Sequence, residues 1–146
     1  MRNRAFLQTE RYKSQQTRAI RAGCHPDIIE FERKLIKKML KLGVPMFCHS
    51  ALRDSDEQNA LYVKGHSKAR GGQSPHNYGL AADVVHSVKA WDLSRAQWAV
   101  VGHVGKELAA SLGIKIEWGG DWEFYDPAHW QLANWRDLGA TWKDKL

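Results

Sequence analysis

The chain has 146 residues, 43% of them hydrophobic and 26% charged, and this balance excludes an intrinsically disordered polypeptide. Its length suits one compact domain with a single hydrophobic core, which we expect to comprise residues 1–146. A net charge of +6 favours polyanionic partners, such as nucleic acid, anionic lipid or bacterial wall polymers, but does not choose among them.

Residues 1–23 form a strongly basic segment. They carry one acidic residue, Glu10, against the basic residues Arg2, Arg4, Arg11, Lys13, Arg18 and Arg21. The segment lacks the apolar stretch and the small-residue cleavage site of a signal peptide, so we expect no signal peptide. No apolar run in the chain approaches the roughly 20 residues that span a bilayer, so we expect no membrane span.

Cys24 and Cys48 are the two cysteines, and they do not form a CxxC pair. In a chain without a signal peptide we expect both thiols to be reduced, although the sequence leaves a bridge between them open. Neither cysteine makes a zinc site by itself.

An amphipathic helix is predicted between Pro26 and Lys41. Its apolar residues recur at spacings of three and four, with Lys and Arg between them, and Gly43 follows its end. Residues 44–52 are then typical of a strand.

A short helix follows, capped by Asp54 or Ser55 and ending near Lys64. Ser55 and Gln58 have the spacing of a capping box, and Gly65 is a suitable terminator.

The second half of the chain alternates short strands with one long helix. Residues 81–87, 114–118 and 129–132 are typical of strands, and Ser94 opens a helix that keeps its apolar period until Gly113. Separated strands mixed with three helices predict an α+β fold, in which a small, mostly antiparallel sheet packs with helices.

The stretch SPHNYGLAADVV, residues 74–85, holds His76 and Asp83 seven positions apart. On a continuous strand this separation places two side chains on opposite faces, so both can point one way only if the chain turns, and Gly79 supplies that turn. Asp83 would then project from a strand among apolar residues, where a metal ion is the most effective partner for its charge. For this pair alone, a hydrogen-bonded turn is the simpler alternative.

The stretch DPAHWQ, residues 126–131, supplies a second histidine and another acid. His129 is predicted to start the last strand, with Asp126 one turn before it. Two imidazoles and one carboxylate are enough to hold a catalytic zinc ion and leave a position for water. The candidate ligands are therefore His76, Asp83 and His129, and Asp126 is the candidate base for that water.

The motifs SPHNYGLAAD, EWGGDW and DPAHW resemble those of the M15 family of zinc peptidases, which act on peptidoglycan. The family pattern SxHxxGxAxD fits residues 74–83 without a gap, and its [DE]xxH element fits residues 126–129. The resemblance covers roughly residues 44–131 and implies an α+β fold like that of DD-peptidases and Hedgehog proteins. It also implies Zn²⁺ as cofactor, with the three candidate ligands as its ligands and Asp126 as catalytic acid/base.

The segment SALRDSDEQNALY is similar to the part of the family in which an Arg precedes a helix that carries a Gln. The resemblance implies that Arg53 binds the scissile carbonyl and the developing oxyanion, a task that suits a fixed guanidinium. Leu52 stands where the family usually has a tyrosine, and the alternative is an Arg at the helix entry paired with Asp54 or Asp56. The candidate substrate contacts are Ser74, Gln58 and Trp118.

The function implied by the resemblance is that of an endolysin, a zinc-dependent peptidoglycan endopeptidase that hydrolyses the L-Ala–D-Glu bond of the peptide stem. Asp126, where the dipeptidases of the family have Glu, and the sequence WGGDW point to this branch. We expect a monomer that is made in the host cytoplasm and reaches the cell wall at phage lysis. We expect no nucleic-acid partner, because no known nucleic-acid motif is present.

Two alternatives remain open. One is a D-Ala-D-Ala carboxypeptidase of the same family, which would act on the end of the stem. The other is a non-catalytic, zinc-stabilised binding module, because the fold also occurs in signalling proteins without peptidase activity. The presence of Asp126 argues against this second alternative.

Overall fold

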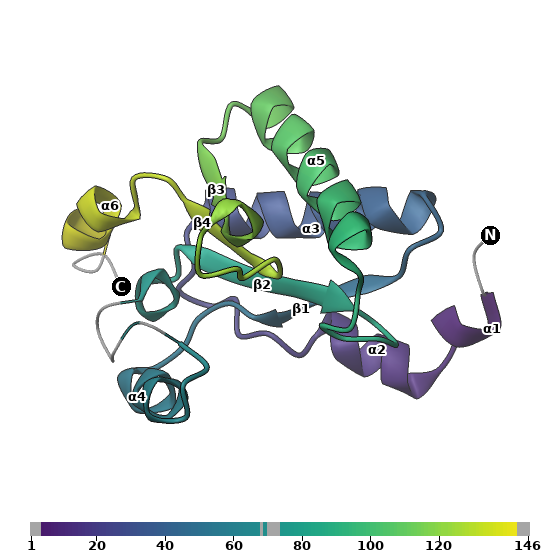
Figure 1. Cartoon of the computed structure of the whole chain (residues 1–146), viewed down its shortest axis with the longest axis horizontal. Coiled ribbons are helices and arrows are strands. Elements are labelled where there is room, and N and C mark those ends of the chain that lie inside the picture. The colour runs from purple at the N-terminus through teal and green to yellow at the C-terminus, as the bar shows by residue number, and fades with distance from the viewer. Residues whose placement is uncertain (1–3, 68, 70–73, 143–146) are drawn as a thin grey trace.

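The computed structural model describes residues 4–67, 69 and 74–142, and these form a four-stranded sheet with helices around it (Figure 1). The strand order is β1 (Met46–Ser50), β2 (Ala81–His86), β4 (His129–Leu132) and β3 (Ile116–Trp118). All three pairings are antiparallel. The predicted α+β class and its strands are thus confirmed, although β1, β2 and β3 are shorter than the sequence pattern indicates.

Two long helices, α3 (Pro26–Lys41) and α5 (Arg95–Leu112), pack against each other and against the sheet (Figure 1). Helix α3 buries an apolar stripe that consists of Ile28, Phe31, Leu35, Ile36 and Met39. Trp130 of β4 contacts Phe31 of this stripe, with the ring centroids 5.0 Å apart. Because alternate residues of a strand face opposite sides, His129 and Gln131 point away from the helices.

Two glycines let α5 approach β3 and β4 closely. The indoles of Trp118 and Trp130 are stacked, with ring centroids 5.8 Å apart. A Cβ atom at Gly102 or Gly105 would overlap one of these rings. The absence of side chains at these two positions therefore lets both indoles be buried beneath the helix.

Shorter helices complete the fold: α4 (Ser55–Val63), α6 (Trp135–Trp142) and the 3₁₀ turns η1 (Pro75–Tyr78) and η2 (Gly119–Asp121). Asp54 caps α4 by accepting a hydrogen bond from the Glu57 amide, so the capping box predicted for Ser55 and Gln58 is wrong. The helix start predicted at Ser94 is confirmed, and Ser94 forms a capping box with Gln97. Helix α6 was not predicted, and it stacks Trp135 on Tyr78 of η1.

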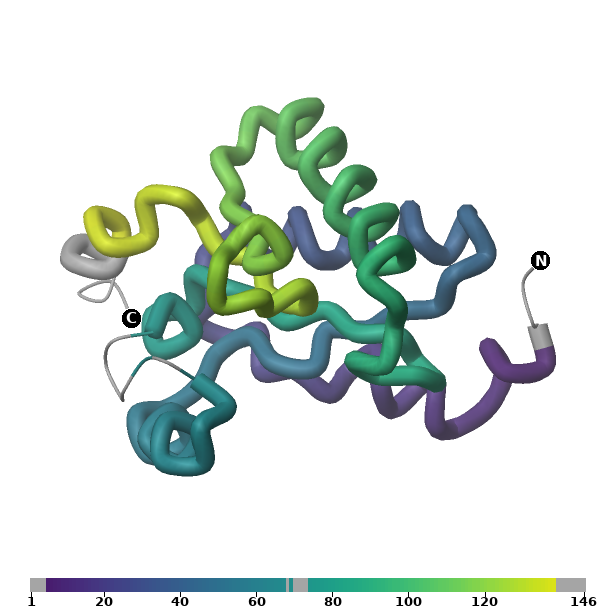
Figure 2. The backbone as a smooth tube through the Cα atoms, in the orientation of Figure 1, coloured from purple at the N-terminus to yellow at the C-terminus, as the bar shows by residue number. Residues whose placement is uncertain are grey.

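The basic N-terminal segment forms α1 (Arg4–Leu7) and α2 (Glu10–Gln16), neither of which its weak apolar pattern predicted. The chain then runs beside β1, which is an edge strand (Figure 2). Gln16 Nε2 donates to Met46 O and Arg18 Nε to His49 O, each at 3.1 Å. The segment thus occupies carbonyl groups that an edge strand otherwise leaves unpaired.

No helix in the described part of the chain is long and apolar enough to cross a membrane.

Candidate metal centre

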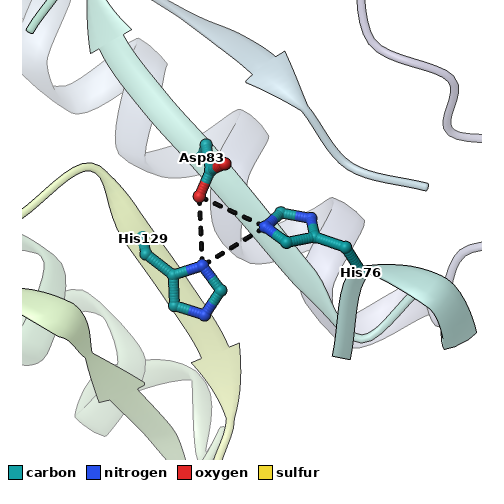
Figure 3. Close-up of side chains that lie close together, drawn as sticks. All are labelled: His76, Asp83 and His129. Carbon is teal, nitrogen blue, oxygen red and sulfur yellow. Dashed lines mark hydrogen bonds and ion pairs between the residues drawn. The ribbon is translucent and has the colours of Figure 1, made fainter. Parts of the chain in front are cut away.

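His76, Asp83 and His129 lie together on the side of the sheet that faces away from α3 and α5. Figure 3 shows their side chains pointing toward one another. Asp83 and His129 are direct cross-strand partners in β2 and β4, which places both side chains on one face. His76 comes from η1, just before β2.

Gly79 brings His76 into this group. It ends η1 in the left-handed region, with φ of 70°. A Cβ at this position would also collide with the backbone of Gly23 and Cys24. The turn predicted at Gly79 is therefore present, and only glycine meets both requirements there.

The three inward atoms form a nearly regular triangle. His76 Nε2 lies 3.2 Å from Asp83 Oδ1 and 3.2 Å from His129 Nδ1, and His129 Nδ1 lies 3.0 Å from Asp83 Oδ1. In a tetrahedral zinc site with bonds of about 2.0–2.1 Å, ligand atoms lie roughly 3.3 Å apart. The size of the triangle therefore fits a zinc ion.

Hydrogen bonds on the outer side of each ring set the tautomers. His76 Nδ1 lies 2.8 Å from Ala51 O, and His129 Nε2 lies 2.9 Å from Gln131 Oε1. Both oxygens can only accept, so the ring protons are on these outer nitrogens when the imidazoles are neutral. The two inward nitrogens and the Asp83 carboxylate are then all hydrogen-bond acceptors, with no proton between them. A cation bound at the centre of the triangle would satisfy their lone pairs.

Burial and charge act differently on the two histidines beside the carboxylate. Burial lowers the pKa of His76. Burial also disfavours a charged His129, but the hydrogen bond and the charge of Asp83 outweigh it and raise the pKa of His129. Burial disfavours the ionised form of Asp83, but the charges and hydrogen bonds of His76 and His129 outweigh it and hold the pKa of that carboxyl well below its usual value. The donor set of two nitrogens and one ionised oxygen is one that zinc prefers.

Arg53 lies beside the triangle and binds the carboxylate oxygen of Asp83 that is not part of it. Its Nη2 donates to Asp83 Oδ2 at 3.2 Å and to Ser50 Oγ at 3.2 Å, while its Nη1 donates to Gln58 Oε1 at 2.6 Å. The alternative pairing with Asp54 or Asp56 is not what the structure shows. Ser50 faces Asp83 across an irregularity in the pairing of β1 with β2, and such bulges re-aim side chains near functional sites.

Asp126 stands in the loop between η2 and β4. The amide of His129 donates to Asp126 O at 3.1 Å, which fixes the acid one turn before the ligand as predicted. In the described part of the chain its carboxylate has no hydrogen-bond partner. Burial, reinforced by the negative charge of Asp83, raises the pKa of the Asp126 carboxyl to about 6.

Comparison with known proteins identifies the family to which the chain belongs. A family model described as D-alanyl-D-alanine carboxypeptidase matches residues 67–132, the stretch that contains the triangle and Asp126. The peptidoglycan L-alanyl-D-glutamate endopeptidase CwlK of Bacillus subtilis is 31% identical over 136 residues, which cover 80% of this chain and 78% of CwlK. The chain belongs to the M15 family of peptidases.

Solved structures agree with this assignment. The L-Ala D-Glu endopeptidase ChiX of Serratia marcescens matches with a TM-score of 0.67 and 28% identity, over 90% of this chain and 92% of ChiX. The vancomycin-resistance D,D-pentapeptidase VanY, whose structure is a complex with Zn(II), matches with a TM-score of 0.56 over 84% of this chain and 80% of VanY. At 14% identity VanY supports the fold alone. As an M15 member the chain is a metallopeptidase, which excludes the non-catalytic binding module.

The three predicted substrate contacts of this M15 peptidase all have protein partners. Ser74 Oγ accepts from the His76 amide and caps η1. Gln58 is fully buried, with its amide nitrogen bonded to Ser67 Oγ and Ala69 O, each at 2.7 Å. Trp118 lies in the core and donates from Nε1 to Pro127 O at 2.7 Å. Contact with substrate by these residues stays a prediction, and the structure gives each of them a supporting role.

Two residues beside the metal triangle of the M15 peptidase were not predicted. The indole of Trp122 lies over His129, with ring centroids 5.2 Å apart. Gln131 accepts from His129 on its outer side. Gln131 stands two residues after the candidate ligand His129, on the same face of a strand, and the sequence did contain this signal.

Proposed function

We propose that this M15 peptidase hydrolyses the bond between L-alanine and D-glutamate in the peptide stem of bacterial peptidoglycan. CwlK and ChiX, two relatives above 25% identity, are both named for cleavage at these residues. The observation that carries the proposal is the triangle of His76, Asp83 and His129, with the carboxylate of Asp126 beside it and without a hydrogen-bond partner among the described residues.

The triangle would hold one zinc ion through His76 Nε2, Asp83 Oδ1 and His129 Nδ1. Zinc bound there would polarise the scissile carbonyl and lower the pKa of the attacking water. The outer hydrogen bonds of both histidines keep the rings oriented, and Arg53 keeps one carboxylate oxygen of Asp83 facing inward.

Asp126 would move the proton. Its pKa of about 6 lies near neutral pH, so the carboxylate can accept a proton from water and return it to the leaving amine. The absence of a hydrogen-bond partner within the described residues leaves its oxygens available for that transfer.

Arg53 would bind the oxygen of the scissile carbonyl as negative charge develops on it. Three hydrogen bonds already fix its guanidinium in place. A guanidinium has five N–H donors, so further donors remain for the substrate. A donor that is fixed before the reaction stabilises charge without reorganising during it.

The family model described as D-alanyl-D-alanine carboxypeptidase favours a second candidate, release of the terminal D-alanine. Purified muropeptides incubated with the enzyme separate the two activities by mass spectrometry. We expect a new D-glutamate amino terminus, absent with Asp126→Asn protein. Accumulation of free D-alanine without that terminus would replace the proposal with the carboxypeptidase. Action on the wall during phage lysis stays a prediction.

A further inference from the structure

Gln131 links the metal triangle to a charged residue on the neighbouring strand. Its side chain is buried and lies on the same face of β4 as His129. Its Oε1 is 2.9 Å from His129 Nε2, and its Nε2 donates to Glu117 Oε2 at 2.9 Å. Glu117 in β3 is the direct cross-strand partner of Gln131. The three side chains form one continuous chain of hydrogen bonds that ends at the metal triangle.

The donors and acceptors in this chain allow one arrangement. The Glu117 carboxylate can only accept, so the amide nitrogen of Gln131 must face it. The amide oxygen of Gln131 then faces His129 and can only accept. A neutral His129 must therefore carry its proton on Nε2, which leaves the lone pair of Nδ1 for the position between His76 and Asp83.

The two histidines of the triangle are held by different kinds of group. His76 donates to a backbone carbonyl, Ala51 O, which no substitution removes. His129 donates to a side chain, whose own orientation depends on a further side chain. The hydrogen bonds that set the tautomer of His129 therefore come from two side chains, those of Gln131 and Glu117, which substitution can remove.

We propose that Gln131, oriented by Glu117, is a positioning residue that fixes the tautomer and ring orientation of His129 for zinc binding. The inference rests on the proposed function only in that His129 is taken as a zinc ligand. It goes beyond that function because it assigns a role to two residues that are neither candidate zinc ligands nor the proposed catalytic residues Asp126 and Arg53. Groups that orient metal-binding histidines contribute to metal affinity through the ligand they hold.

The alternative is a cross-strand pair that serves only the sheet. A pair of that kind would contribute only to the stability of the sheet. The two roles differ in what a substitution changes: metal affinity in the first case, and stability of the metal-free protein in the second.

The first test is Gln131→Met, which keeps the side-chain volume and removes both polar ends. We expect zinc affinity, measured by competition with a chromophoric chelator, to fall about 10- to 100-fold. The thermal midpoint of the metal-free protein should change little. An unchanged zinc affinity would overturn the inference, as would a loss confined to the thermal midpoint.

The second test exchanges the two side chains. In the double variant Gln131→Glu with Glu117→Gln, the residue at position 131 still accepts from His129 Nε2, and the amide at position 117 donates to it. Zinc affinity should return at least to the wild-type level, whereas Gln131→Met stays low. If the double variant binds zinc as weakly as Gln131→Met, hydrogen bonding to His129 is not the cause and the inference fails.

Two controls separate this inference from the proposed function. Glu107→Gln removes one negative charge from an exposed position of α5, paired with His103, and should leave zinc affinity unchanged. His129→Ala should abolish zinc binding by the site. If His129→Ala binds zinc as the wild type does, the proposed metal site is wrong and this inference falls with it. If His129→Ala loses zinc but Gln131→Met does not, only this inference is wrong.

Discussion

Asp83 and Asp126 are two carboxylates of one site whose surroundings push their pKa values in opposite directions. His76 and His129 outweigh the effect of burial on Asp83 and hold its pKa low, whereas burial raises the pKa of Asp126 to about 6. A permanently ionised group suits a metal ligand, and a group that titrates near neutral pH suits proton transfer. The structure therefore supports different roles for the two acids.

Replacing Asp126 by Asn should separate catalysis from metal binding. The amide cannot accept the proton of water, so we expect kcat on muropeptides to fall about 10²- to 10⁴-fold. Zinc content should stay that of the wild type, since the three ligands are untouched. Asp137→Asn, an exposed acid in α6, is the matched control and should retain activity. A rate near that of the wild type for Asp126→Asn would mean that another group is the base.

Replacing Arg53 by Lys tests whether the guanidinium acts on the substrate or only on Asp83. Lysine keeps the charge but loses the planar set of donors, and loss of one oxyanion donor costs on the order of 10²–10³ in kcat. We expect that loss with zinc still bound. An unchanged kcat with a lowered melting temperature would leave Arg53 a structural partner of Asp83 alone.

At the level of residues, the motifs located the candidate site but not the hydrogen bonds that hold its side chains in place. His76, Asp83, Asp126 and His129 stand in spacings that the sequence displays directly. The partner of Arg53 was not predictable, because Asp83 reaches it only through the irregular pairing of β1 with β2. Long-range hydrogen bonds of this kind depend on strand register, and the shift in register between Cys48 and Ser50 is a local irregularity that the alternation of apolar and polar residues does not reveal.

At the level of elements, α3, α4 and α5 were predictable, α4 from its cap Asp54 and its terminator Gly65, whereas α1, α2 and α6 were not. α3 and α5 were found with correct ends, since each has a regular buried stripe and a clear cap or terminator. α1, α2 and α6 are short, and α2 has no buried residue at all. Such helices are stabilised by tertiary contacts, which the sequence of the segment alone does not reveal.

The connection between α2 and α3 gives the basic N-terminal segment a structural role. Arg21 forms an ion pair with Glu32 of α3, whose side chain is 1% exposed. The amide of Leu52, next to Arg53, donates to Ile20 O at 3.1 Å. The segment thus joins α3 to the loop that carries Arg53.

Replacing Arg21 by Ala should therefore destabilise the fold. Removing one partner of a buried ion pair leaves the other charge without compensation, which costs on the order of 3 kcal/mol. We expect that loss in the free energy of unfolding measured with urea. Arg21→Met combined with Glu32→Leu should recover much of it, because no charge is then buried. A single Arg21→Ala protein as stable as the wild type would show that the segment is not anchored by this pair.

At the level of the whole molecule, the basic residues of α3 and the candidate metal site lie on different faces. α3 presents its Lys and Arg residues to solvent on the face opposite the metal triangle; they are Arg33, Lys34, Lys37, Lys38 and Lys41. A net charge of +6 favours association with an anionic polymer, and salt weakens such association. Binding to purified sacculi should therefore decrease as the salt concentration rises.

We infer that catalysis depends on one zinc ion held by His76, Asp83 and His129. The most direct test is the metal content of the active enzyme, measured by elemental analysis on protein purified without added metal and related to its rate on muropeptides. We expect one zinc per chain, with activity lost as a chelator removes the metal and regained when zinc is restored. A metal-free protein with full activity would contradict the account.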